Sequence, residues 1–251
     1  ILNIIKISFL TYFLYIFFFP SLWESPLINT YAVFTNLGNH PMGGTHLYLG
    51  NLISFSEAPW HYIPVWIFVT VPVFYTLFFI LGLFDFLLNF IKNKKTSSLN
   101  QDILFLLMFV TPIFAIIILN STIYDGWRHL YFIYPFFVIF VVKGLISFSR
   151  SFNKYKKINK LFKIIILFAL LDTAFWMHKN HPYQFTYFNK IVRNSVFGNF
   201  EIDYLSASYK TNYDFLIKNE KKDLYLIADS GTRVKLFYSL FSLSASDRQK
   251  F

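Results

Sequence analysis

Five long apolar runs constrain the fold of this chain more than any other feature of its sequence. A helix needs about 20 mostly apolar residues to cross the hydrocarbon core of a bilayer. Five runs near or above that length predict an all-α polytopic membrane protein with about five transmembrane helices. The runs are Ile4–Phe19, Ile63–Ile91, Ile103–Leu119, Leu130–Phe148 and Leu161–Met177.

Composition supports this class of protein. Only 14% of the 251 residues are charged, whereas a typical soluble domain has about 25%. The net charge of +10 would suit a nucleic-acid-binding protein, but the basic residues sit in short segments between the apolar runs. That distribution follows the positive-inside rule of membrane proteins. We therefore expect membrane lipids as partners and no nucleic acid. The absence of cysteine excludes disulfides and Cys-ligated metals.

The same basic residues predict the orientation of the runs. Lys92, Lys94 and Lys95 follow the second run, and six basic residues lie in the range from Arg150 to Lys163. Both segments should be cytoplasmic. This orientation places residues 20–62 and 120–129 in outer loops of a membrane region that spans residues 1–177. We expect a multi-pass protein of the cytoplasmic (inner) membrane, with residues 178–251 forming an extracytoplasmic tail.

Two of the runs have special features. The second contains Pro64, Pro72 and Gly82, so it should tilt, kink or begin as an interfacial segment. The first lacks the basic n-region and small-residue cleavage site of a signal peptide, which favours a short span. Because the chain starts at Ile1 rather than Met, inside an apolar run, we expect it to be a fragment.

Shorter elements are predicted outside the runs. Ser25 and Pro26 resemble an N-cap followed by proline at the first helical position, and apolar residues between Leu27 and Leu37 follow at helical spacing. A helix on the membrane surface would fit this pattern. In the tail, we expect Ser206 to cap a helix through about Asn219. The range Asp223–Ala228 has the alternation of a strand. The tail should be a small soluble α/β unit that is cut short.

The first candidate site lies in the outer loop between the third and fourth runs. Arg128 offers a planar fork of donors suited to phosphate, His129 adds a further donor, and Asp125 is placed to orient the arginine. The segment therefore predicts a phosphate-binding corner at the outer interface. The alternative is a short loop in which Arg128 snorkels and aromatic neighbours anchor the hairpin.

The second candidate site follows the last run. His181, Tyr183, Tyr187 and Asn189 combine aromatic surfaces with polar tips, as contacts to sugars or lipid headgroups do. The alternative is an aromatic interface belt before a folded tail. Three outer histidines (His40, His46 and His61) fit no compact metal-ligand spacing. The sequence therefore predicts no specific cofactor, and it does not decide whether a divalent metal is needed.

Three charged residues lie within or near the apolar runs. Asp85 and Lys143 are near cytoplasmic ends, where snorkelling explains them. Asp172 lies near the outer end of the last run and is expected to face a polar cavity, because a charge inside a span usually has a function. The outer carboxylates before the tail form no acidic pair, so the catalytic residues stay unknown.

Four blocks of sequence resemble bacterial membrane glycosyltransferases related to protein O-mannosyltransferases, which use a polyprenyl-phosphate sugar donor. The most specific block is Tyr124–Pro135. The others are Gly44–Gly50 with Pro59–Pro64, His181–Asn189 and Phe200–Tyr204, all in the same order as in the family. The chain departs from the pattern at Leu205 and Ser206, where a Trp-Gly-like pair is expected.

The resemblance implies a C-type glycosyltransferase fold and the transfer of a sugar from a polyprenyl-phosphate carrier at the outer membrane face. Arg128, His129 and Asp125 would then bind the carrier phosphate. His181, Tyr183 and Asn189 would help to wall the cavity, and His61 joins the substrate-binding set. In such enzymes the catalytic carboxylates lie in the first outer loop, so this chain resembles the C-terminal part.

Two other functions stay open from the sequence. A transporter or permease would use the proline-interrupted spans and Asp172 to line a path, although no paired repeat is visible. A non-catalytic membrane scaffold in envelope polysaccharide assembly would use the tail to bind partners. A solvated tail without a membrane-proximal cavity would favour the scaffold.

Overall fold

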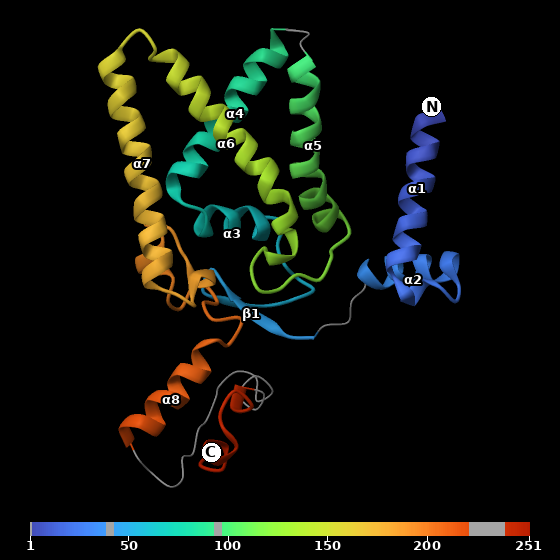
Figure 1. Ribbon diagram of the computed structural model, residues 1–251, viewed down its shortest axis with the longest axis vertical. Helices are drawn as coiled ribbons and strands as arrows, with labels where there is room; N and C mark the ends of the chain where they lie inside the picture. The colour runs from blue at the N-terminus through green and yellow to red at the C-terminus, as the bar shows by residue number, and fades with distance from the viewer. Residues whose placement is uncertain (1, 39–42, 93–96, 221–238) are drawn as a thin grey trace.

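The computed structural model describes residues 2–38, 43–92, 97–220 and 239–251 (Figure 1). It is mostly helical, with one small sheet of two strands. The α-helices are α1 (Leu2–Phe18), α2 (Pro26–Gly38), α3 (Tyr62–Thr70), α4 (Val73–Ile91), α5 (Ser97–Ile118), α6 (Tyr134–Ser151), α7 (Lys156–Lys179), α8 (Ser208–Glu220) and α10 (Ala245–Arg248). Short 3-10 helices are η1 (Pro20–Leu22), η2 (Arg128–Ile133), η3 (Gln184–Thr186) and η4 (Arg193–Ser195), and the strands are β1 (Thr45–Tyr48) and β2 (Asn51–Ser54).

In the part of the chain that the structure describes, four helical segments are long and apolar enough to cross a membrane. They are α4, the Leu99–Ile118 part of α5, η2 together with α6, and α7. This confirms four of the about five predicted spans and indicates a multi-pass membrane protein. The first run forms a shorter apolar helix, Ile5–Phe18, which lacks the length of the other four.

The long second run is not one span. It breaks at Val71, whose backbone is extended (φ −97°, ψ 142°), and resumes as α4 after Pro72. Proline has no amide hydrogen to continue a helix and disfavours helical geometry in the residue before it. The break lets α3 lie across the bundle instead of along it (Figure 1). The run thus begins as a separate helix, α3, and the predicted interfacial position of this first segment stays a prediction.

Helices α4 and α6 cross at two glycines. A Cβ atom added to Gly82 would lie 2.0 Å from the carbonyl oxygen of Phe140, and one added to Gly144 would lie 1.9 Å from that of Phe78. Small residues allow membrane helices to approach this closely, because their association depends on tight packing. This crossing therefore sets the geometry of the bundle.

Polar pairs also join the helices. Asp85 on α4 accepts a hydrogen bond from Ser147 Oγ on α6 at 2.9 Å. Lys143 on α6 forms an ion pair with Asp102 on α5 at 2.7 Å. The prediction that Asp85 and Lys143 merely snorkel was therefore wrong, because each has a partner on a neighbouring helix.

The bundle has two different ends. The α6–α7 turn lies at the same end as the last turn of α4 and the first turn of α5, so the basic residues Lys92 and Arg150 share that end (Figure 1). The opposite end, which we call the hairpin end, holds the β1–β2 hairpin, α3, η2 and residues 178–205 (Figure 1). The long helices α4 to α7 thus run in alternating directions, and Lys92 and Arg150 lie at one end, as the loop charges predicted.

The sequence analysis missed the hairpin. Its strands pair antiparallel, with His46 opposite Ile53 and Leu47 opposite Leu52. The turn contains Leu49 and Gly50, both with positive φ (49° and 81°), which is the backbone that two-residue hairpins favour. The sheet thus lies within residues 20–62, the segment predicted to be an outer loop, whereas the strand predicted at Asp223–Ala228 falls outside the described residues.

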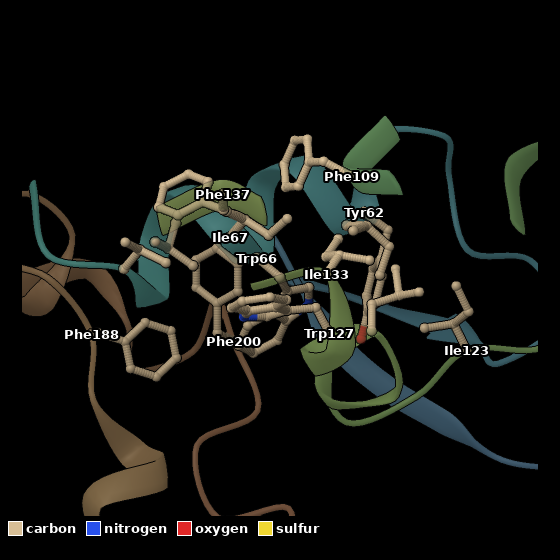
Figure 2. Close-up of a cluster of buried hydrophobic side chains, with 14 of the residues drawn as sticks. Tyr62, Trp66, Ile67, Phe109, Ile123, Trp127, Ile133, Phe137, Phe188 and Phe200 are labelled. Carbon is tan, nitrogen blue, oxygen red and sulfur yellow. The ribbon is translucent and has the colours of Figure 1, made fainter. Parts of the chain in front are cut away.

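An aromatic core fills the hairpin end (Figure 2). Tyr62 and Trp66 of α3 point into it, together with Trp127, Phe188 and Phe200 from three later segments (Figure 2). Residues 178–205, which the sequence analysis assigned to the tail, thus share one core with α3 and η2. The chain leaves this core only at α8.

The predicted helices outside the bundle are present, with one change of cap. Helix α2 begins at Pro26, as expected, and its residues Leu27, Ile28 and Tyr31 are exposed. Helix α8 is the helix expected after Ser206, but the Ser206 side chain does not cap it. The carboxylate of Asp203 accepts hydrogen bonds from the backbone N–H groups of residues 207 and 208 at 2.9 Å each. A carboxylate near a helix N-terminus accepts from free N–H groups, as a hydroxyl does, and its negative charge also interacts favourably with the helix dipole.

Candidate functional site

A cavity lies where the hairpin end meets the long apolar helices. It has a volume of about 670 Å³, within the range of small-molecule sites. Its walls come from the end of α3, the start of α4, the turn before η2, the start of α6, the last turns of α7 and the segment after α7. The lining residues are Trp66, Thr70, Val71, Pro72, Tyr75, Asp125, Gly126, Trp127, Tyr131, Tyr134, Leu170, Thr173, Ala174, Met177, Gln184, Phe185, Tyr187 and Tyr204.

The two candidate segments of the sequence meet in this cavity. Asp125 and Trp127 of the block Tyr124–Tyr131 line the cavity, and so do Gln184 and Tyr187 of the block His181–Asn189. The blocks are separated in the sequence by residues 132–180, and the fold of α6 and α7 brings them together. A membrane-proximal cavity is thus built from both of them.

The turn before η2 holds its shape through unusual backbone geometry. Asp125 and Gly126 both have positive φ (57° and 73°), which Asp tolerates better than most residues. The backbone N–H of Gly126 donates to the Tyr62 hydroxyl at 3.1 Å. Trp127 Nε1 donates to Thr70 Oγ1 at 2.9 Å. Helix α3 therefore fixes both ends of the turn that presents Asp125 to the cavity.

Asp125 and Arg128 form an ion pair at 2.8 Å. The Arg128 guanidinium lies over the rings of Tyr124, at 5.2 Å, and Tyr204, at 5.8 Å. Its Nε is buried and has no hydrogen-bond partner within the described part of the chain. The ring of His129 packs edge-on against Tyr124, with centroids 4.7 Å apart. The three residues predicted as a phosphate-binding corner are thus adjacent, although only Asp125 lines the cavity itself.

A guanidinium in this setting suits an oxyanion. Aromatic rings bind cations through their faces and limit the motion of the side chain. Arg128 is 31% exposed in its side chain, so its remaining donors are accessible. Burial raises the pKa of Tyr204, which keeps this phenol neutral and able to donate. The corner therefore combines a fixed positive charge with neutral hydrogen-bonding groups.

The second predicted set is placed differently. Asn189 is buried, and its Nδ2 donates to the carbonyls of Phe68 at 2.5 Å and Val71 at 3.1 Å. The side chain thus satisfies carbonyls that the end of α3 leaves unpaired. Tyr183 bonds to Thr211, and exposed His181 contacts Gln184 Nε2 through its Nδ1 at 2.7 Å. As far as the described ranges define the lining, these three residues are not part of it.

Of the three outer histidines of the sequence analysis, His46 and His61 lie beside the core, and His40 falls outside the described residues. His61 Nδ1 is 2.6 Å from the Tyr48 hydroxyl and, on the same described residues, does not line the cavity. His46 is 2% exposed, stacks on Phe55 and lies against Tyr62. Burial lowers the pKa of His46 to about 4. A search of the described residues found no group of three or more His, Asp or Glu side chains that would hold a metal ion.

Sequence reasoning missed most of the aromatic lining. Tyr75, Tyr134 and Tyr204 were not chosen, because tyrosines near the ends of apolar runs are also typical of an interface belt. A usable signal exists in the two blocks themselves, because Tyr187 was among the candidates and lines the cavity, and Trp127 lies in the same block as Asp125. Which of several neighbouring side chains faces a cavity in a 3-10 segment depends on the local backbone, and the sequence pattern does not show it.

Comparison with known proteins adds no family to this picture. No family model matches the chain, and no significant match was found among curated proteins or solved structures.

Proposed function

We propose that this chain belongs to a membrane glycosyltransferase that takes a sugar from a polyprenyl-phosphate carrier at the outer face of the cytoplasmic membrane. The proposal combines the resemblance of its four sequence blocks with the geometry of the cavity. In this orientation the C-terminal segment is extracytoplasmic and the short helix α1 is a fifth membrane segment. The acceptor would approach from the same face.

One observation carries the proposal: the two candidate blocks line one cavity at the junction of the membrane helices and the hairpin end. Helix α7 contributes Leu170, Ala174 and Met177 to its walls. Every residue of α7 is at least partly exposed, so a lipid chain would have access along this helix. An apolar chain beside α7 and a polar headgroup near Asp125 and Arg128 match a polyprenyl-phosphate sugar.

Arg128 has a defined part in the proposed reaction. The acceptor gives its proton to a carboxylate that the resemblance assigns to another loop and attacks the anomeric carbon of the sugar. The carbon–oxygen bond to phosphate breaks, and the carrier phosphate leaves with an additional negative charge. A fixed guanidinium stabilises that charge more in the transition state than in the bound donor. Asp125 orients the guanidinium through the ion pair. The aromatic lining offers surfaces on which a sugar ring can stack.

The cavity also separates this proposal from the scaffold alternative. The scaffold alternative would be favoured if no cavity lay near the membrane-spanning helices, but a cavity of about 670 Å³ lies there. The permease alternative would route substrate along Asp172, which lies in an ion pair at a separate groove.

Donor binding is the sharpest test, because the resemblance assigns the catalytic carboxylates to another loop. The full chain, purified in detergent, would be titrated with a polyprenyl-phosphate-mannose labelled in the sugar. We expect Arg128→Ala to weaken binding about tenfold or more, the usual effect of losing hydrogen bonds to a charged group. In a protein with measurable transferase activity, the same change should abolish transfer while leaving membrane insertion intact.

Arg193→Ala is the matched control. Arg193 also stacks on an aromatic ring, that of Trp176 at 5.8 Å, but does not line the cavity in the described residues. It should bind the donor as the wild type does. Equal binding by the wild type and Arg128→Ala, or full transfer activity in that variant, would refute the assignment.

A further inference from the structure

A second groove lies beside the cavity, on the other side of a shared wall. Its volume is about 540 Å³, and Pro72, Thr173 and Tyr187 line both spaces. The rest of the groove is mostly apolar, with Val73, Phe74 and Leu77 from α4 and Phe168 and Ala169 from α7. The groove thus follows the gap between two membrane-spanning helices.

An ion pair stands at this groove. Lys190 Nζ lies 2.8 Å from Asp172 Oδ2, and both residues line the groove. The side chains are 65% and 55% exposed, respectively. Asn189, the residue before Lys190, is buried and bonded to the end of α3. The position of Lys190 is therefore fixed by the fold, although its ammonium is accessible.

The ion pair lies well inside the C-terminal end of α7. Asp172 lies seven residues before the last residue of α7, Lys179, which corresponds to roughly 10 Å along the helix axis. Its neighbours Phe168, Leu171 and Phe175 are exposed apolar side chains, as on a lipid-facing helix. Charged groups at the edge of the hydrocarbon are costly unless a polar partner meets them. The two charges meet each other, and their exposed sides are open to further polar groups from the membrane.

We propose that the groove binds a phospholipid with a phosphoethanolamine headgroup, with an acyl chain lying between α4 and α7. Lys190 binds the lipid phosphate, and Asp172 accepts from the lipid ammonium group. The headgroup joins the ion pair as a second pair of opposite charges. This site is separate from the cavity and does not depend on the proposed glycosyltransferase function.

Charge complementarity selects this lipid over other membrane components. An anionic headgroup such as phosphoglycerol, or a polyprenyl phosphate, meets Lys190 but is repelled by the Asp172 carboxylate 2.8 Å away. A phosphocholine headgroup carries the same charges, but its quaternary ammonium has no hydrogen to donate. The ethanolamine ammonium has three, so the carboxylate discriminates between the two.

The test is lipid retention by the full chain. Protein purified in mild detergent is incubated with an equimolar mixture of phosphatidylethanolamine, phosphatidylglycerol and phosphatidylcholine, without any sugar donor. Retained lipids are then counted by native mass spectrometry. We expect phosphatidylethanolamine to be retained over the other two by about fivefold, the ratio that corresponds to the upper range for an accessible ion pair.

Three variants define the expected outcomes. Asp172→Asn should lose the preference for phosphatidylethanolamine over phosphatidylglycerol, and Lys190→Ala should retain less of all three lipids. The double exchange of Asp172→Lys with Lys190→Asp keeps a pair of opposite charges and should keep the preference. It also supplies the test where a single variant fails to insert.

The control is Lys250→Ala, which removes an exposed ion pair with Asp247 in the C-terminal segment. It should retain lipids as the wild type does. Equal retention of the three lipids by the wild type would overturn the proposal. An unchanged preference in Asp172→Asn would do the same. Because no sugar donor is present, neither result bears on donor binding by Arg128.

Discussion

The glycine crossing of α4 and α6 allows a quantitative prediction for Gly144→Ala. The added Cβ would lie 1.9 Å from the Phe78 carbonyl oxygen and 2.8 Å from its carbon, whereas ordinary contacts begin at 3.4 Å. The helices would have to separate by roughly 1.5 Å at this point, which is the difference between an ordinary contact of 3.4 Å and the 1.9 Å from the added Cβ to the oxygen. The obstructing atoms belong to the backbone of α4, so no rotamer change relieves the clash.

Overpacking of this kind costs about 2–3 kcal/mol of unfolding free energy, which corresponds to a fall in Tm of roughly 5–10 °C for a chain of this size. Tm would be measured in detergent from the intrinsic tryptophan fluorescence. Gly43→Ala is the control, because a Cβ added at Gly43 meets nothing within 4 Å. It should leave Tm unchanged. An unchanged Tm for Gly144→Ala would show that α4 and α6 do not approach as closely as described.

Three further predictions use the same measurement. Asn189→Ala should lower Tm, because two buried carbonyls at the end of α3 lose their donors, at about 1–3 kcal/mol for each unpaired group; a stable variant would mean that α3 does not need this cap. The pKa of His46 is held at about 4 in the fold against 6.5 in the unfolded chain. The unfolded state therefore binds the proton more readily, and stability should be lost as pH falls from 6.5 to 4, by roughly 3 kcal/mol in total. His46→Phe should remove this loss, and equal pH profiles for the two proteins would contradict it. Lys143→Met should destabilise more than Lys143→Met combined with Asp102→Ala, because the single change leaves a carboxylate with 14% side-chain exposure without its cation; the reverse order would argue against the pair.

The long helices were predictable because a bilayer permits few solutions. Each apolar run must satisfy its backbone hydrogen bonds internally, and a helix is the simple way to do so. The break at Pro72 was also visible as one of three alternatives, since proline restricts both itself and Val71. The hairpin was missed because its turn residues, Leu49 and Gly50, include no strong hairpin signal.

The candidate site was predicted in its location better than in its members. The sequence indicated that the blocks around Arg128 and Tyr187 belong on the same side, and the fold places both at one cavity. Asn189 was chosen for its polar side chain, but it bonds to the end of α3. Nothing in the local pattern distinguishes a side chain that satisfies a buried carbonyl from one that faces a ligand.

The sequence by itself determined the helical membrane architecture, because hydrophobic length and loop charge act locally and add along the chain. The sequence already placed Asp125 to orient Arg128, but only the tertiary structure decided which charges pair between different elements. Asp172 and Lys190 lie 2.8 Å apart, as do Asp125 and Arg128, and Lys143 meets Asp102 at 2.7 Å. Two of these pairs join different elements. Such pairing depends on helix crossing and side-chain direction, which the close approach of Gly82 and Gly144 fixes only once the bundle has packed.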